Sequence, residues 1–138
     1  MAFTGNYTCN TFKLGLPSGD FDFASGTTDV FKIALYTNAA SLDDTTAAYT
    51  TDGEVSATGY TAGGEVLTPS VAISDGTSFI DFGDVSWNGA FTARGALIYK
   101  NGGAAICVLD FGADRTSTSV FQVQFPANTN SSALIRIS

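Results

Sequence analysis

Histidine is absent from this chain, and its absence removes much of the chemistry on which enzymes depend. Without imidazole there are no Ser-His or Cys-His nucleophile pairs and no histidine metal ligands. Paired carboxylates remain, and the pairs able to come close together are Asp20/Asp22, Asp43/Asp44, Asp81/Asp84 and Asp110/Asp114. Glycoside hydrolysis would need two such acids about 5–10 Å apart across a sugar cleft. We expect turn-forming aspartates instead, because Asp bonds its own backbone in turns, and we predict that the chain is not an enzyme.

The same acidic pairs bear on metal binding. Calcium prefers carboxylate oxygens, and a calcium site at Asp43/Asp44 is a stronger alternative to turn-forming aspartates than glycoside hydrolysis is, although the spacing of an EF-hand loop is absent. We expect neither a metal ion nor another cofactor.

Charge is also scarce, since 14% of the residues are charged against roughly 25% in a typical soluble domain. The 6 Lys and Arg residues are outnumbered by 13 Asp and Glu residues and do not cluster. Nucleic acid and anionic membrane surfaces attract clustered basic residues, so neither is an expected partner.

No apolar run reaches the roughly 18 residues of a membrane span. Residues 1–5 lack the basic and apolar regions of a signal peptide, so we expect folding in a cytosol.

Cysteine is nearly absent too, and Cys9 and Cys107 are the two in the sequence. Cys107 lies within the apolar run 104–109, where it suits a small core residue. A disulfide would need the two Cα atoms within about 7 Å of each other, a distance the sequence does not give. We expect two reduced thiols.

Short apolar runs separated by turns are abundant, and 11 Phe and 5 Tyr residues supply bulk for a core. Many runs alternate apolar and polar residues, as half-buried strands do. Asp75-Gly76 is a strong hairpin signal, and Pro69 indicates a sheet edge or a break. The predicted strands are residues 30–36, 65–68, 71–73, 79–82, 85–87, 93–100, 104–111, 121–125 and 133–137. The pattern predicts an all-β, antiparallel sandwich or jelly roll in one domain, residues 29–138.

A long polar loop is predicted for residues 38–53, with Leu42 and Tyr49 as its apolar anchors. Three glycines follow it at positions 59, 63 and 64. We expect these glycines to let the chain bend at positive φ, which other residues avoid.

Residues 1–28 precede the first clear strand and form a leader. A short helix is predicted at residues 8–16, capped by Thr8 or Asn10 and ended by Pro17-Ser18-Gly19. The leader carries more aromatic residues than a loose tail needs, namely Phe3, Tyr7, Phe12, Phe21 and Phe23. We predict that these are interface residues, with the leader adding a strand to a neighbouring chain or lying in its groove. The alternative is that the leader packs on its own sandwich.

Two single residues stand out within the strands. Arg94 lies in an otherwise apolar strand, and we expect it to pair with a carboxylate such as Asp84 or Asp110, because an unpaired buried charge is costly. The alternative is an edge arginine whose head reaches solvent. Trp87 alternates with Val85 along its strand, so we expect it in the core rather than as a platform for stacking a sugar.

Five sequence stretches, taken in order, are similar to those of a known protein family. The stretches are 31–37 (FKIALYT), 47–50 (AAYT), 54–64 (EVSATGYTAGG), 92–99 (TARGALIY) and 108–112 (VLDFG). In this order they resemble a family of small virion structural proteins of tailed bacteriophages, including cyanophages and short-tailed phages. The resemblance runs from residue 29 to the end of the chain, and its ordered set of motifs is more specific than any one motif.

The resemblance implies a component of a virion, assembled in the host cytoplasm. The first expectation is a capsid decoration or cement protein, an oligomer with a trimer favoured, that bridges subunits of the major capsid protein. A tail, collar or fibre component that contacts host glycan is the second. A stand-alone carbohydrate-binding domain or small glycosidase is the third, and the missing catalytic groups count against it.

Overall fold

The computed structural model describes residues 3–24, 26–126, 128–129 and 131–137, and its central element is a five-stranded antiparallel sheet. The strands lie in the order β1 (Tyr7–Thr8), β8 (Ala105–Thr116), β7 (Thr92–Lys100), β2 (Phe31–Tyr36) and β3 (Glu65–Leu67). The most apolar predicted runs became β7 and β8, which pair along most of their length through a turn at residues 101–103. These two strands therefore form the middle of the molecule.

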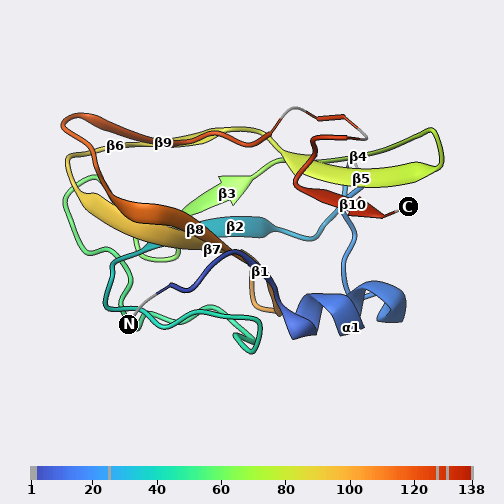
Figure 1. Cartoon of the computed structure of the whole chain (residues 1–138), viewed down its shortest axis with the longest axis horizontal. Helices are drawn as coiled ribbons and strands as arrows, with labels where there is room; N and C mark the ends of the chain where they lie inside the picture. Colours follow the sequence, from blue (N-terminus) through green and yellow to red (C-terminus); the bar gives the residue numbers. More distant parts are fainter. Residues whose placement is uncertain (1–2, 25, 127, 130, 138) are drawn as a thin grey trace.

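Two smaller antiparallel sheets make a second layer over one face of this sheet (Figure 1). One sheet has the order β10 (Ile135–Ile137), β5 (Thr77–Phe82) and β4 (Pro69–Ser74), and the other pairs β6 (Val85–Asn88) with β9 (Val120–Val123). Figure 1 places β6 and β9 at one end of the molecule and the β4–β5 hairpin at the other. The all-β, antiparallel fold predicted from the strand pattern is confirmed.

The main core fills the space between the two layers. β2 contributes Phe31, Ile33 and Leu35, three alternate residues of the predicted strand 30–36, and each is fully buried. Trp87 on β6 is 2% exposed and packs near Tyr60, with 6.1 Å between ring centroids. The tryptophan is therefore a core residue, as predicted.

Two turns depend on backbone conformations that glycine favours. The β4–β5 hairpin turns through Asp75 and Gly76, whose φ angles are 52° and 77°, as a two-residue hairpin loop of this twist requires. Gly64 has φ 81°, and a Cβ there would lie 1.7 Å from the carbonyl oxygen of Ile33. The positive φ predicted for Gly59 and Gly63 is confirmed as well, at 93° and 94°.

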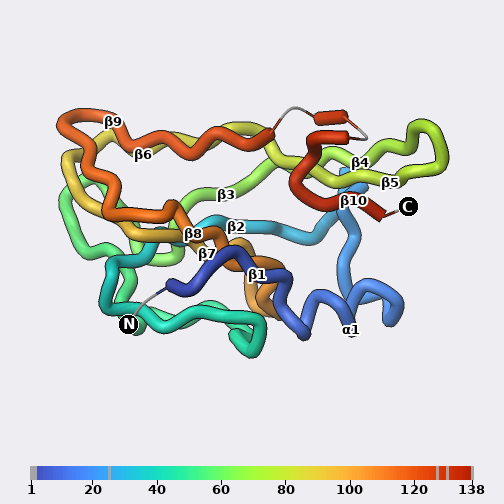
Figure 2. The backbone as a smooth tube through the Cα atoms, in the orientation of Figure 1, coloured from blue at the N-terminus to red at the C-terminus, as the bar shows by residue number. Residues whose placement is uncertain are grey.

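The opposite face of the five-stranded sheet carries a second hydrophobic cluster. Tyr36, Leu97 and Val108 rise from β2, β7 and β8, and Leu42 covers them from the predicted polar loop. Figure 2 shows this loop, residues 38–53, running along that face. The sheet is thus buried on both sides.

The leader packs on its own domain through one helix, one short strand and an extended stretch. Helix α1 (Asn10–Ser18) lies close to the predicted residues 8–16, but Cys9 takes the capping position without a side-chain bond. The helix ends at Gly19 in the left-handed conformation, with φ 80°. Phe12, Phe21 and Phe23 then enter the main core.

Phe23 tests how far the fold needs the leader. Its ring stacks on Phe31 with 4.5 Å between centroids and is 5% exposed. We expect Phe23→Ala to lower the free energy of unfolding by about 3–5 kcal/mol, because it leaves a cavity in the core. Chemical denaturation followed by circular dichroism measures the change.

Leu14→Ala is the matched control, since Leu14 lies in the same leader and is 72% exposed. It should change the free energy of unfolding by less than about 0.5 kcal/mol. Deletion of residues 1–23 should unfold the chain, and a stable β domain after that deletion would contradict the structural role given to the leader.

Candidate interaction surface

The five leader aromatics predicted as interface residues lie mostly inside the chain's own core. Phe3, Phe12, Phe21 and Phe23 are each between 3% and 8% exposed. Tyr7 is half-buried in β1, and its hydroxyl lies 2.5 Å from Thr4 Oγ1. The added strand proposed for a neighbour is made within the chain, because β1 pairs with β8. The alternative, in which the leader packs on its own sandwich, describes this structure.

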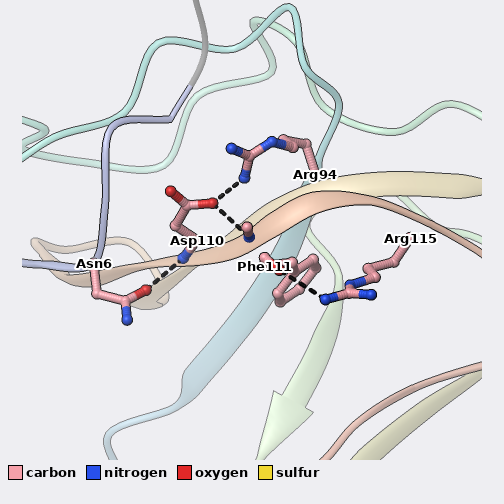
Figure 3. A network of polar contacts seen from close by, with 6 residues as sticks. Asn6, Arg94, Asp110, Phe111 and Arg115 are labelled. Atoms are coloured by element: carbon pink, nitrogen blue, oxygen red, sulfur yellow. Dashed lines mark hydrogen bonds and ion pairs between the residues drawn. The ribbon is translucent and has the colours of Figure 1, made fainter.

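Asp110 on β8 holds the leader through a network drawn in Figure 3. Its carboxylate forms an ion pair with Arg94 Nη1 and accepts the Gly112 N–H at 2.8 Å. Its own backbone N–H donates to Asn6 Oδ1 at 2.6 Å. The side chains of Arg94 and Asp110 are 16% and 13% exposed. Arg94 therefore has one of its two predicted partners and is not a free edge arginine.

The Arg94 guanidinium also covers Phe3, with 5.6 Å from its Cζ to the ring centroid. A cation placed over an aromatic face is attracted by the negative face of the ring. Gly95 makes room for this ring, because a Cβ there would lie 2.4 Å from Phe3 and 2.5 Å from the Leu109 carbonyl oxygen. The start of the leader is thus locked against the β7–β8 hairpin by packing and charge together.

In each predicted acid pair, at least one aspartate accepts a backbone N–H, as turn-forming aspartates do. Asp43 accepts hydrogen bonds from the Thr45 hydroxyl and the Thr45 N–H, at 2.5 and 2.8 Å, and these bonds lower its pKa. Asp84 accepts a backbone N–H from the segment after β9 at 2.7 Å. Among the residues that the structure describes, no group of three or more His, Cys, Asp and Glu is placed to hold a metal ion.

Asp81 is the buried carboxylate of this set, at 2% exposure on β5. Burial raises its pKa above the ordinary value, and the charge of Asp84 acts in the same direction. Backbone N–H groups of Phe82 and Leu134 donate to it and oppose the shift. The carboxyl therefore ties β5 to the segment before β10.

Glu54 organises the loop region that precedes β3. Its two carboxylate oxygens accept the hydroxyls of Tyr49 and Tyr60, each at 2.5 Å, and the Gly63 N–H at 2.8 Å. Burial and these bonds to Glu54 raise the pKa of Tyr49 and Tyr60. Burial also raises the pKa of Tyr99 to about 12, and its hydroxyl donates to the Gly63 carbonyl at 2.7 Å. This cluster fixes the loop as part of the folded body.

Cys9 and Cys107 are free thiols, and both are buried. Cys9 belongs to the second cluster and Cys107 to the main core, on the other face of the sheet. Burial raises the pKa of both, to about 11 for Cys9, where the charges of Asp43 and Asp44 add to the effect. Thiols of this kind are packing residues rather than nucleophiles.

Exposed apolar side chains gather instead on the strand β4, residues 69–74, which we call the β4 edge. Ile73 is 73% exposed and Val71 is 47% exposed. Across β5 on the same face, Ile137 of β10 is 47% exposed. The sequence held a signal for this surface, because Pro69 indicated a sheet edge or a break and residues 69–74 carry no charge.

An open groove of about 430 Å³ runs between the end of β8 and β9. Phe111, Arg115, Gln122 and Gln124 line it with aromatic, guanidinium and amide groups. Figure 3 shows Arg115 beside Phe111. Arg115 Nη2 donates a hydrogen bond to the Phe111 carbonyl oxygen at 3.2 Å. The groove offers polar donors beside a ring.

Comparisons with protein-family models, with curated proteins and with solved structures gave no match to this chain. Within the described ranges, no helix is long and apolar enough to cross a membrane.

The contribution of the Arg94–Asp110 ion pair to the free energy of unfolding can be measured. We expect Arg94→Ala to lower the free energy of unfolding by about 3 kcal/mol, because it leaves the Asp110 carboxylate largely buried and unpaired. Arg136→Ala removes an exposed arginine and should cost less than about 0.5 kcal/mol in the same denaturation assay. An equally small effect for Arg94→Ala would show that the pair contributes nothing to the fold.

Asp81 makes stability depend on pH. Because burial raises its pKa in the folded state, the folded protein holds this proton more tightly than the unfolded chain does. The stabilisation is complete below about pH 4, the pKa of an unfolded Asp, and is lost as the pH rises through the raised pKa. Asp81→Asn removes this titration, so the stability of the variant relative to wild type should rise with pH across that window.

Denaturation of both proteins at a series of pH values measures the Asp81 effect. Asp114→Asn, at an exposed position of β8, is the control and should keep the pH dependence of the wild type. A stability difference between Asp81→Asn and wild type that is independent of pH would contradict the assignment.

Proposed function

We propose that this chain is a non-enzymatic structural protein of a tailed bacteriophage virion, acting as a capsid decoration or cement protein. In this role it binds the major capsid protein and stabilises the head by bridging neighbouring subunits. It is assembled into the virion in the host cytoplasm. The source of this proposal is the resemblance of the five sequence stretches between residues 31 and 112 to small phage structural proteins.

The β4 edge is the structural observation that supports the proposal most. A strand with exposed Val71 and Ile73 and no charged residue is an unusual surface for a protein that acts alone, because sheet edges are normally protected by charge. Proteins that add strands to one another use such edges, with main-chain hydrogen bonds for affinity. A capsid component needs lasting contacts of this kind.

The fixed leader and loops also suit a structural role. The Asp110 network holds the leader, and the Glu54 cluster holds the loop before β3, so both segments are ordered parts of one body. A protein that bridges subunits gains affinity when its contact surfaces are ordered before binding. An acidic balance of -7 also disfavours contact with the packaged nucleic acid, which is compatible with a position on the outer surface of the head.

Copy number in purified particles tests the proposal. A cement protein should be present in many copies, at a fixed ratio to the major capsid protein, and quantitative mass spectrometry measures that ratio. Heads that lack the protein should release their DNA at a lower temperature and should recover when the purified protein is added. A few copies per particle, or no binding to such heads, would contradict a cement role.

A tail, collar or fibre component that contacts host glycan is the second candidate. The groove between β8 and β9 favours it, because Arg115, Gln122 and Gln124 supply donors and acceptors beside the Phe111 ring. Sugars are commonly held by such polar groups next to an aromatic face. A low copy number together with glycan binding that Gln122→Ala abolishes would favour this candidate over cement.

A further inference from the structure

The β4 edge ends its sheet, and in the described part of the chain no strand pairs with its outer side. Figures 1 and 2 show the β4–β5 hairpin projecting at one end of the molecule, away from the five-stranded sheet. The hairpin is therefore open to a partner strand.

The register of the hairpin determines which backbone groups face outward. The two-residue turn makes Ser74 and Thr77 a hydrogen-bonded pair, and such pairs then alternate along antiparallel strands. Ala72 and Ser70 consequently bond to β5, which agrees with the bond from Gly83 N–H to Thr68 O further along. The intervening residues, Val71 and Ile73, direct their N–H and C=O groups away from β5.

We propose that a second copy of this chain pairs with the β4 edge, antiparallel and related by a two-fold axis at Ala72. In this register Val71 of each copy lies opposite Ile73 of the other, and each such pair exchanges both backbone hydrogen bonds. The outward groups of one copy thus meet the outward groups of its partner. Two-fold, self-complementary contacts are the commonest way in which identical chains associate.

Neighbouring registers are poorer. A shift that centres the axis on Val71 places Ile73 opposite Pro69, which has no N–H to donate. A shift the other way, centred on Ile73, places Val71 opposite Asp75, which lies in the turn at φ 52°. In the register centred on Ala72, both central pairs join Val71 to Ile73, and Pro69 lies opposite Asp75 only at the two ends of the contact.

Side chains and charge favour a second copy as the partner. Val71 and Ile73 lie on one face of the strand, so pairing forms a continuous row of β-branched side chains across the interface, a favourable cross-strand combination. Each copy carries a formal charge of -7, yet residues 69–74 are uncharged, so two acidic chains meet where repulsion is least. In this register the two Asp75 side chains lie at opposite ends of the contact.

The association is independent of the virion role, because it is measured on the purified chain alone. The wild-type protein should sediment as a concentration-dependent dimer in analytical ultracentrifugation. Ile73→Lys should raise the dissociation constant by about tenfold or more, because it places a charge in the contact. Leu14→Lys alters a residue of nearly the same exposure, 72% against 73%, and should leave the dimer unchanged. Unchanged circular dichroism of each variant shows that the fold is kept.

Cysteine cross-linking tests the register itself. Residue 72 lies opposite its own copy in a pair without backbone bonds, where the two Cα atoms are about 4.5 Å apart, within disulfide range. Ala72→Cys should therefore oxidise to a covalent dimer. Ser70→Cys should not, because its two copies lie about 13 Å apart along the strands. The native cysteines are buried and do not compete.

A wild-type monomer at all concentrations would overturn the proposal. So would a trimer that Ile73→Lys leaves intact, because a three-fold contact then uses another surface. Equal cross-linking at positions 70 and 72 would overturn the register. Failure of the particle-binding experiment, by contrast, would affect the cement role and leave this dimer standing.

Discussion

Burial of the β7–β8 pair on both faces is the constraint on which the rest of the structure depends. Ile98 and Ile106 point into the main core, whereas Leu97 and Val108 point into the second cluster. An antiparallel sheet usually leaves one face to water, and such a sheet needs only one covering layer. Here both faces are apolar, so the chain has to supply two covers. Strands β5, β6, β9 and β10 cover the main core, and the later part of the leader closes its end. The first part of the leader and the loop at residues 38–53 cover the second cluster.

This requirement explains why the leader is structural. Phe3 and Cys9 cover the second cluster, while Phe12, Phe21 and Phe23 close the end of the main core against Phe31 and Phe82. The polar contacts of Asp110 with Arg94, and of its backbone with Asn6, then hold the leader in register. Aromatic residues and a largely buried ion pair act together here, because neither alone would fix the direction in which the chain enters the sheet.

The fold was largely predictable because it depends on local patterns. Alternation identified β2 and β6, continuous apolar runs identified β7 and β8, and the Asp75-Gly76 turn identified the β4–β5 hairpin. The surface on which the leader packs was not predictable in the same way. The number of aromatic residues in residues 1–23 indicates that these side chains are buried, but not whether they pack against their own chain or against a neighbouring one. A contact between Phe21 and Phe12 of the same leader leaves the same sequence pattern as a contact between Phe21 and a neighbouring chain. The choice between Asp84 and Asp110 for Arg94 also depended on strand register, which pairs Gly95 with Asp110 across the sheet.

The same reasoning moves the candidate contact surface from the leader to the β4 edge. Leader aromatics that complete a core are not available to a partner, because removing them would expose the main cluster to water. Val71 and Ile73 can contact a partner without loss of stability to the folded chain, because they are already exposed and contribute little to its core. A protein with few charges has little electrostatic protection against unwanted pairing, so an uncharged apolar edge persists only where pairing is tolerated or used. Pro69, which begins β4, has no N–H to offer a partner strand, so any such pairing stays short.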